Sequence, residues 1–470
     1  MPPQSSYRPD PRLTDLGPDF ADPVKAADFP QTLLRFRNDR AAATVGLETL
    51  SDAEWVAHFG RFQPLAGNLD PPLAQRYHGH QFRVYNPDLG DGRGFTFAQL
   101  REAGTDRLLD LGTKGSGRTP WSRDGDGRLT LKGGMREVLA TAMLESLGVP
   151  TSRSFSLIET GEDLVRSDEP SPTRSAVLVR LSHSHIRFGT FQRHAFEESP
   201  DRIRQLVDYV VDNYYPELAE APDRAVALLE AVCAASANLA AAWLAAGFVH
   251  GVLNTDNMNI TGESFDYGPY RFLPKNDPNF VAAYFDSQGL YSFGRQPEAV
   301  FWNLQHLGGC LSLFADQDEL VSALNSFPVA YRTALAGHVV RRLGVVPAGR
   351  DQDSALVNAA FVAMGAGGER LRWEPFFFDW FCGDTDRAMS SVRGDIYAGE
   401  AFTPFRTLMA GRKADRPERL QAATFAQAEP QELLYDEIEA IWAAIAADDD
   451  WQPFQTKLAS LEAARLAWGF

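Results

Sequence analysis

The sequence predicts an α+β fold in which a strand-rich part comes first and a larger helical part follows. Short apolar runs such as FTFAQL and RLLDLGTKG alternate with glycine-rich turns in the first part, as expected for strands. Later segments such as DRIRQLVDYVVDNYY and PQELLYDEIEAIWAAIA carry apolar residues at helical spacing. Strands and helices that are segregated along the chain are typical of the α+β class. We therefore expect an N-terminal extension (1–60), a strand-rich lobe (61–180) and a helical lobe (181–470).

The individual elements follow from the same patterns. The extension becomes helix-like in SDAEWVAHFG, and we expect it to pack onto the body of the protein. The second region should contain the strands FRVYNP, FTFAQL, RLLDLGTKG, SFSLIE, DLVRS and AVLVRLS. One helix, GMREVLATAMLESLG, interrupts them, with Val138, Leu139, Ala142 and Met143 at helical spacing and Gly148 as its stop. Helices predicted further on include RAVALLEAVCAASANLAAAWLAAG, PEAVFWNLQHLGGCLSLF and ELVSALNSFPVAYRTAL.

The composition is that of a globular protein with a large core, since 44% of the 470 residues are hydrophobic and 11% are aromatic. The formal net charge of −17 argues against a nucleic-acid surface, which would be basic. Cys233, Cys310 and Cys382 form no C-x-x-C pair, so the sequence predicts neither a disulfide framework nor a zinc site and fits a reducing compartment.

We expect a cytoplasmic protein that contacts no membrane. The first residues, MPPQSSYRPDPRLTD, lack the apolar core of a signal peptide. The most apolar stretch, 225–249, is long enough to span a membrane, but Glu230 and Asn238 within it favour a buried core helix.

A glycine-rich segment, LGDGRG, has two interpretations. Gly90 and Gly92 let the backbone approach a ligand and leave N–H groups free for phosphate oxygens. The same segment is typical of a tight hairpin turn, and taken alone it favours the turn. The chain contains no GxxxxGK[ST] segment, so the sequence excludes a P-loop.

Lysine is scarce in this chain, and Lys114 follows the strand-like run LLDLGT. Protein kinases pair a strand lysine with a helix glutamate to place an ammonium group on nucleotide phosphates, and Glu137 lies in the next predicted helix. The alternative is a surface lysine together with a glutamate that favours the helix N-terminus. Asp126 and Gly127 form a further turn that could hold a nucleotide or a metal, although alone they are ordinary turn residues.

Two arginines, Arg180 and Arg187, lie at the end of a predicted strand and in the loop after it. This placement suits bidentate recognition of phosphate, and it suits surface ion pairs equally well. The H-x-H patterns in YHGHQF and LSHSHI are weak evidence for a metal site, because neither has a third ligand.

The strongest signal is HGVLNTDNMNITGESFDYG. Protein kinases have a catalytic loop H-R-D-L-x-x-x-N followed by D-F-G. His250 and Asn257 keep that spacing and Asp266 begins DYG, but Val252 stands where the kinase base would be. Asp256, Asn257 and Asp266 offer oxygen ligands for Mg²⁺ or Mn²⁺ bound with phosphates, whereas an Asx-rich turn would not explain the order of the motifs. The order predicts nucleotide binding in a protein-kinase-like bilobal fold.

These segments resemble the selenoprotein O (SelO) family of protein adenylyltransferases, which have a kinase-like fold. The resemblance covers about 60–310 and includes YHGHQF, LGDGRG, TKGSGRTPWSRDGDGR, the MRE of the helix, VLVRLSHSHIRFGTF and GFVHGVLNTDNMNITGESFDYGP. It implies that ATP binds in the direction opposite to that in ordinary kinases. AMP would then pass to Ser, Thr or Tyr hydroxyls of proteins with release of pyrophosphate, and UTP is a second candidate donor.

The resemblance also implies roles for the matching residues. Asp256 would accept the proton, Asn257 and Asp266 would ligate Mg²⁺ or Mn²⁺, and Glu137 would orient Lys114. The residues implied to bind the nucleotide are Gly90, Gly92, Arg93, Lys114, Asp126, Gly127, Arg180 and Arg187.

The sequence departs from the family pattern in two places. Arg83 follows Phe82 where the family often has glycine, and no cysteine follows Cys382, so redox regulation through a C-terminal cysteine is not expected. Two other functions stay open, a kinase-type phosphotransferase and a non-catalytic nucleotide-binding scaffold, and Val252 favours the scaffold.

Overall fold

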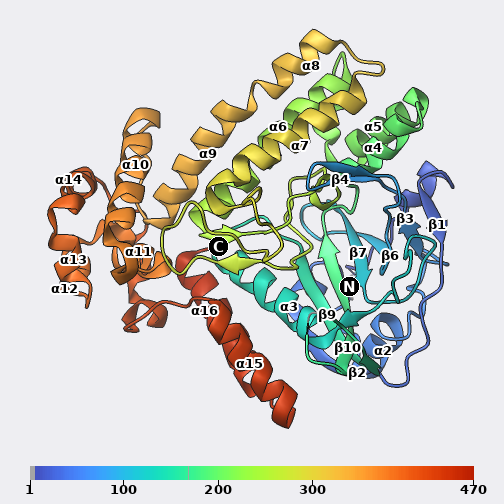
Figure 1. The fold of residues 1–470 in the computed structure, drawn as a ribbon, viewed down its shortest axis with the longest axis horizontal. Helices are drawn as coiled ribbons and strands as arrows, with labels where there is room; N and C mark the ends of the chain where they lie inside the picture. Colours follow the sequence, from blue (N-terminus) through green and yellow to red (C-terminus); the bar gives the residue numbers. More distant parts are fainter. Residues whose placement is uncertain (1–5, 168) are drawn as a thin grey trace, which may run out of the picture.

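An antiparallel sheet near the N-terminus is followed by a helical region in the computed structural model, which describes residues 6–167 and 169–470 (Figure 1). This confirms the predicted α+β class. The main sheet has the strand order β1-β3-β6-β7-β10-β9-β2, with β8 beside β10. Its strands are β1 (Ala21–Pro23), β2 (Leu33–Arg37), β3 (Leu73–Gln75), β6 (Thr96–Arg101), β7 (Leu108–Lys114), β8 (Leu129–Thr130), β9 (Arg153–Leu164) and β10 (Thr173–Ser182). Two small sheets pair β4 (Gly79–Gln81) with β5 (Val84–Asn86) and β11 (Phe248–Val249) with β12 (Arg271–Phe272).

Helices cover the sheet and form the rest of the body. They are α1 (Asp39–Ala43), α2 (Asp52–Phe59), α3 (Leu131–Ser146), α4 (Phe188–Phe196), α5 (Pro200–Tyr214), α6 (Arg224–Ala245), α7 (Gln296–Leu311), α8 (Gln317–Leu324), α9 (Phe327–Arg342), α10 (Arg350–Gly367), α11 (Trp373–Asp379), α12 (Thr385–Ser390), α13 (Gly394–Ala398), α14 (Thr403–Ala410), α15 (Tyr435–Asp448) and α16 (Gln452–Trp468). Figure 1 shows α16 returning to the sheet side of the molecule, where it packs against α3.

The main sheet is buried on both faces because its central strands are apolar on both sides. In β10, Leu178 belongs to the core that includes α3, whereas Val177 and Val179 belong to a second core with Trp55 and Phe59 of α2. The alternation follows from the two-residue period of a strand. It fixes β7 and β10, which carry predicted site residues, between two packed layers.

Residues of the predicted extension also take part in the sheet. Of the described residues before 61, β1 pairs with β3 at one edge and β2 pairs with β9 at the other. Residues 1–5 of the extension lie outside the described residues. The limits of the three predicted regions stay a prediction.

The long apolar stretch forms α6, which packs against α5, α7, α8 and α9. Within the described residues, α6 is the one helix that is long and apolar enough to cross a membrane, and most of its apolar window is buried inside the protein. This burial fits the interpretation of a core helix.

Some predicted elements have different limits in the structure. The predicted helix ELVSALNSFPVAYRTAL is two helices, α8 and α9, because Pro328 cannot continue a helix and instead occupies the first turn of α9. The predicted strand DLVRS supplies only the end of β9, at Leu164. Helix α3 starts at Leu131, earlier than predicted, because the side chain of Thr130 accepts a hydrogen bond from the Gly133 N–H.

Candidate active site

A cleft of about 700 Å³ collects the predicted site residues. It is lined by the glycine-rich loop, by the ends of strands and by the segment after β11. The sequence-predicted residues that line the cleft are Gly90, Gly92, Arg93, Lys114, Asp126, Gly127, Arg180, Arg187, Asp256, Asn257 and Asp266. The remaining one, Glu137, is buried on α3 and contacts Lys114. The chain therefore brings all of these side chains to one place.

Lys114 connects the sheet, α3 and the DYG segment. It is the last residue of β7, and its Nζ donates hydrogen bonds to Glu137 Oε1 and, at 2.7 Å, to Asp266 Oδ1. The lysine and glutamate side chains are only 7% and 2% exposed. A buried pair of this kind fixes the direction of a long, flexible side chain. The predicted contact between Lys114 and Glu137 is thus present.

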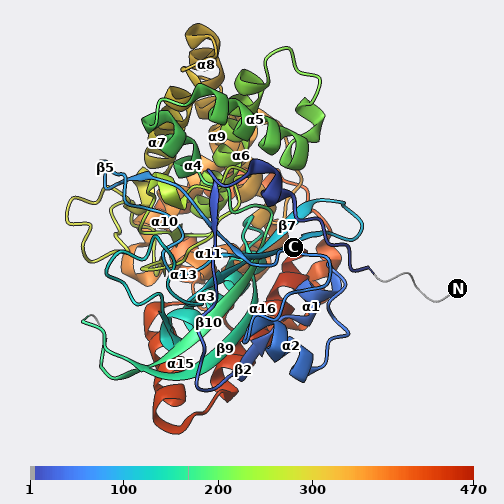
Figure 2. The ribbon, with the colours of Figure 1, turned by 90° about the vertical axis from the view of Figure 1, so that its right-hand side faces the viewer.

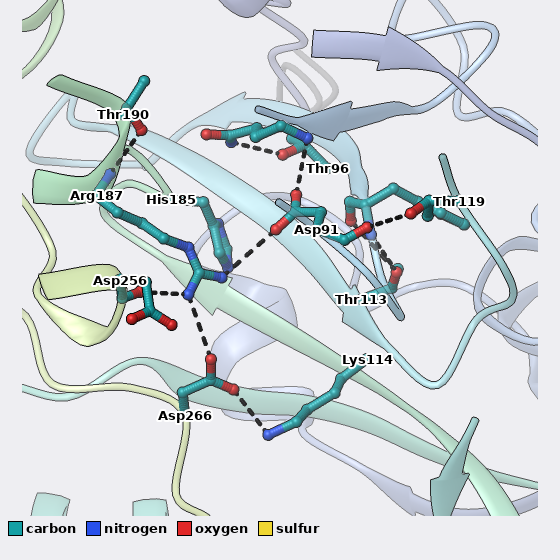
Figure 3. Close-up of polar contacts among 12 residues, drawn as sticks. Asp91, Thr96, Thr113, Lys114, Thr119, His185, Arg187, Thr190, Asp256 and Asp266 are labelled. Carbon is teal, nitrogen blue, oxygen red and sulfur yellow. Dashed lines mark hydrogen bonds and ion pairs between the residues drawn. The ribbon is translucent and has the colours of Figure 1, made fainter. Parts of the chain in front are cut away.

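Asp266 is the point on which three cations converge. Lys114 Nζ donates to its Oδ1, and Arg187 Nη1 lies 3.4 Å from its Oδ2 (Figure 3). Arg180 Nη1 also donates to its Oδ1, at 2.9 Å. Burial alone would raise the pKa of Asp266, but the three cations outweigh it and hold the pKa well below its usual range. Glu137 and Asp91 also lie beside these cations, so three carboxylates balance three positive charges, and the cluster brings three strong hydrogen-bond donors to the inner end of the cleft.

Asp256 is a buried carboxylate beside this cluster. It lies in a short 3₁₀ helix (Thr255–Asn257), is 8% exposed, and its Oδ1 has no hydrogen-bond partner among the described residues. Arg187 Nη1 donates to its backbone carbonyl at 2.7 Å, which holds the segment in position (Figure 3). Burial raises the pKa of Asp256 to about 6, although Arg187 and the side chain of Gln81 lower it. A carboxylate with such a pKa is ionised at neutral pH and can accept a proton.

Asn257 has its amide nitrogen occupied, since Nδ2 donates to the Val252 carbonyl at 3.1 Å. Its amide oxygen has no hydrogen bond with any described residue, so it is available as a ligand for a cation. Within the described ranges, no three or more His, Cys, Asp and Glu residues form a group that could hold a metal. A metal in this cleft would therefore need the oxygens of Asn257, Asp266 and a bound phosphate.

The glycine-rich loop is not a hairpin turn. It joins β5 to β6, which belong to different sheets. A Cβ at Gly90 would lie 2.4 Å from Trp121 Cγ, and a Cβ at Gly92 would lie 2.8 Å from the Trp121 carbonyl oxygen. The glycines are thus required by a tryptophan that packs against the loop, which the sequence alone did not indicate.

Trp121 belongs to a segment that we call the strap, residues 117–128. Thr119 Oγ1 donates to the Asp91 carbonyl at 2.6 Å, and Ser122 Oγ donates to the Gly92 carbonyl. The strap therefore holds the glycine-rich loop from outside. The turn motifs in TPWSRDGDGR indicated this segment in the sequence, but they did not indicate that it contacts the glycine-rich loop.

Asp91 is a second residue that the sequence reasoning missed. Its Oδ2 accepts a hydrogen bond from the Gln75 N–H at 3.0 Å, and its Oδ1 lies 3.5 Å from Arg187 Nη2 (Figure 3). Burial raises the pKa of Asp91, and Arg187 opposes that effect. The loop and Arg187 thus hold one another in place.

Farther out, Asp126 pairs with Arg166 at 2.8 Å and stabilises the strap. Gly127 has a φ of +71°, and a Cβ there would lie 2.3 Å from the Gly117 backbone. Arg93 is exposed, and its backbone carbonyl accepts a hydrogen bond from the Gly115 N–H at 2.7 Å. Seven Lys and Arg side chains and five Asp side chains line the cleft, so it is positive although the whole chain carries −17.

The histidines of the two H-x-H patterns have protein partners. His78 Nδ1 lies 2.8 Å from Tyr85 Oη, His80 Nδ1 lies 2.8 Å from Gln192 Nε2, and His185 Nδ1 lies 3.4 Å from Asp110 Oδ2. These contacts explain the histidines as parts of the packed structure.

Comparison with known proteins agrees with this site. A model of the family described as "Protein adenylyltransferase SelO" matches residues 3–462. The chain belongs to the SelO family. This confirms the predicted resemblance and makes the chain a protein nucleotidyltransferase, a class that implies ATP and protein substrates.

Named relatives match over nearly their whole lengths. The "Protein nucleotidyltransferase YdiU" of Synechocystis sp. is 44% identical, with 96% of this chain and 97% of the relative covered. That of Gloeobacter violaceus is 46% identical over 95% of this chain and 93% of the relative. That of Trichodesmium erythraeum is 43% identical over 96% and 98%. SelO membership therefore extends through the C-terminal helices as well as the cleft.

Proposed function

We propose that this SelO protein transfers AMP from ATP to side-chain hydroxyls of acceptor proteins, within a protein-kinase-like bilobal fold. One observation carries the proposal: three buried cations meet at Asp266, and beside them a cleft-lining carboxylate, Asp256, has an oxygen without a protein partner, whereas position 252 is a valine. The strand residue Lys114 contacts both Glu137 of a helix and Asp266 of the DYG segment, and these contacts support the kinase-like arrangement.

The cations would hold the triphosphate with its tail inward. Lys114, Arg180 and Arg187 already share one carboxylate, so phosphate oxygens can take hydrogen bonds from them without a separate rearrangement of the cleft. If these cations bind the β- and γ-phosphates, the α-phosphorus would face Asp256. Such fixed positive groups stabilise charge that develops on the leaving pyrophosphate.

Asp256 would act as the proton acceptor. The acceptor hydroxyl oxygen forms a bond to the α-phosphorus, the bond from that phosphorus to the oxygen that bridges to the β-phosphate breaks, and pyrophosphate leaves with the electron pair. The hydroxyl proton passes to Asp256 Oδ1, the oxygen without a protein partner. Mg²⁺ or Mn²⁺ would be held by Asn257 and Asp266 and would neutralise phosphate charge.

Label transfer tests the reaction directly. The protein is incubated with α-³²P-ATP or γ-³²P-ATP, Mg²⁺ or Mn²⁺, and a protein acceptor such as casein. We expect acceptor label from the α position only, and none with the Asp256→Asn variant. Label from the γ position alone would show a phosphotransferase, and no label from either nucleotide would favour a binding scaffold.

A further inference from the structure

The hairpin formed by β4 and β5 stands directly beside Asp256. The His80 N–H donates to Thr255 Oγ1 at 2.7 Å, and the Phe82 N–H donates to Asn254 Oδ1 at 3.0 Å. The hairpin is thus fixed to the segment that carries Asp256. A movement of one would move the other.

The register gives this hairpin two different faces. His80 lies opposite Tyr85, and this pair faces the helices: His80 contacts Trp302 of α7, and Tyr85 stacks on Phe196 of α4 at 5.3 Å. Gln81 lies opposite Val84, so these two side chains share the other face. That second face looks onto the cleft.

The cleft-facing side offers both space and an exposed apolar group. Gln81 lines the cleft with Asp256, whereas Val84 is 70% exposed. Gly79 is buried, and a Cβ there would lie 3.1 Å from Asp256 Oδ1, so a glycine is what lets the hairpin pack this close to the carboxylate. The space that an incoming side chain can use is the cleft itself, which Gln81 and Asp256 both line.

The turn of the hairpin is held in a conformation that its residues rarely adopt. Phe82 and Arg83 have φ values of +49° and +64°, a region that favours glycine and asparagine. Phe82 packs against Tyr291 and Phe285, with ring centroids 5.0 and 5.8 Å apart, and Arg83 lies over the ring of Trp302. Such strain concentrates at functional sites, where the surroundings maintain it.

Exposed aromatic residues continue this surface. Tyr284 is 86% exposed and Phe285 is 49% exposed, and both lie in the loop between β12 and α7. In Figure 2, β5 and this yellow-green loop project on the same side of the molecule, and the contact between Phe82 and Phe285 joins them. Aromatic residues that remain exposed beside a catalytic cleft are typical of a protein-binding surface.

We propose that the acceptor protein docks on this surface, which consists of Gln81, Val84, Tyr284 and Phe285. This rests on the function proposed above, because a hydroxyl that enters the cleft beside Gln81 comes next to Asp256. The segment that docks carries the modified Ser, Thr or Tyr past Gln81 and an apolar side chain nearby. That apolar side chain contacts Val84 and the two aromatic residues.

The probe is a heptapeptide library with Ser, Thr or Tyr fixed at the centre and the other positions varied, labelled from α-³²P-ATP. Val84→Asp, Val84→Lys and Tyr284→Ala change the proposed surface. Val362→Asp is the matched control, because Val362 is 68% exposed on α10. Thermal unfolding and the KM for ATP are measured for every variant.

The wild type should prefer an apolar residue near the hydroxyl. Val84→Asp and Tyr284→Ala should raise the KM for the best peptide about tenfold, as expected for losing much of one apolar contact, with an unchanged KM for ATP. Val84→Asp should gain activity on peptides with Lys or Arg at that position, and Val84→Lys on peptides with Asp or Glu. Tyr284→Ala keeps the test decisive if a Val84 variant does not fold.

Three results overturn the proposal. Unchanged peptide preferences, or changes equal to those of Val362→Asp, would place the docking surface elsewhere. A raised KM for ATP in the Val84 variants would show that the hairpin serves the nucleotide. No transfer by the wild type to any peptide or to casein would instead remove the proposed function, and docking with it.

Discussion

Replacing Gly90 with alanine should weaken ATP binding because of Trp121, not because of the nucleotide itself. The added Cβ would lie 2.4 Å from Trp121 Cγ, closer than such atoms approach. The ring cannot move freely: its Nε1 donates to Asp22 Oδ2 at 2.9 Å, and Arg76 and Arg193 lie 5.8 and 5.2 Å from its centroid. Either the Trp121 ring or the glycine-rich loop must therefore move.

The size of the effect follows from what holds the ring. Two cation–π contacts contribute about 0.5–1 kcal/mol each, and a hydrogen bond to a carboxylate about 1.5 kcal/mol. Displacing the ring therefore costs about 2.5–3.5 kcal/mol, and about 1.4 kcal/mol is a tenfold change in an equilibrium constant. We expect Gly90→Ala to raise the KM for ATP between about sixtyfold and three-hundredfold if the full cost falls on ATP binding.

A double-mutant cycle identifies the cause. In the Trp121→Ala background the alanine at position 90 has room, so Gly90→Ala should add less than about twofold there. Gly337→Ala is the control, since a Cβ at Gly337 meets nothing within 4 Å. ATP affinity is measured by titration with a fluorescent ATP analogue and by the KM for AMP transfer. A full loss on Gly90→Ala in both backgrounds would refute the reasoning, because the glycine would then serve the ligand directly.

Three other outcomes are expected. Asp256→Asn should lower kcat for AMP transfer about a hundredfold to ten-thousandfold and leave ATP affinity within about twofold, as for loss of a general base; an equal loss of affinity would contradict that role. Asn257→Ala should raise the Mn²⁺ or Mg²⁺ concentration needed for half-maximal transfer, measured by metal titration, and an unchanged titration would rule it out as a ligand. Burial lowers the pKa of His306 and His338 to about 4, so they stay neutral in the folded protein while the unfolded chain takes up protons below its ordinary histidine pKa of about 6.5. The urea midpoint should therefore fall as pH drops from about 6.5 to 4, and His338→Gln should reduce that slope; an unaltered slope would assign the loss to other groups.

Motif order predicted which side chains meet in the inner cleft. The lysine, the helix glutamate and the DYG aspartate lie far apart in sequence, yet Lys114 contacts both Glu137 and Asp266. Charge and spacing sufficed because the kinase pattern ties each residue type to an element. Trp121 and Gly79 could not be found this way, since their importance depends on which backbone or carboxylate lies next to them in space.

The fold shows the same division. Short apolar runs predicted β7 and β10, because both strands are buried on two faces. The sequence pattern did not predict the helices α11 to α14, because each is too short to show a clear helical period. The short strands β1 and β2 gave little signal, and their place in the sheet depends on distant partners.

A crystal structure with a non-hydrolysable ATP analogue and Mg²⁺ tests the direction of the nucleotide most directly. We predict the terminal phosphates beside Lys114, Arg180 and Arg187, and the α-phosphate facing Asp256. Adenine at the inner end, with the γ-phosphate facing Asp256, would contradict AMP transfer and restore the kinase alternative.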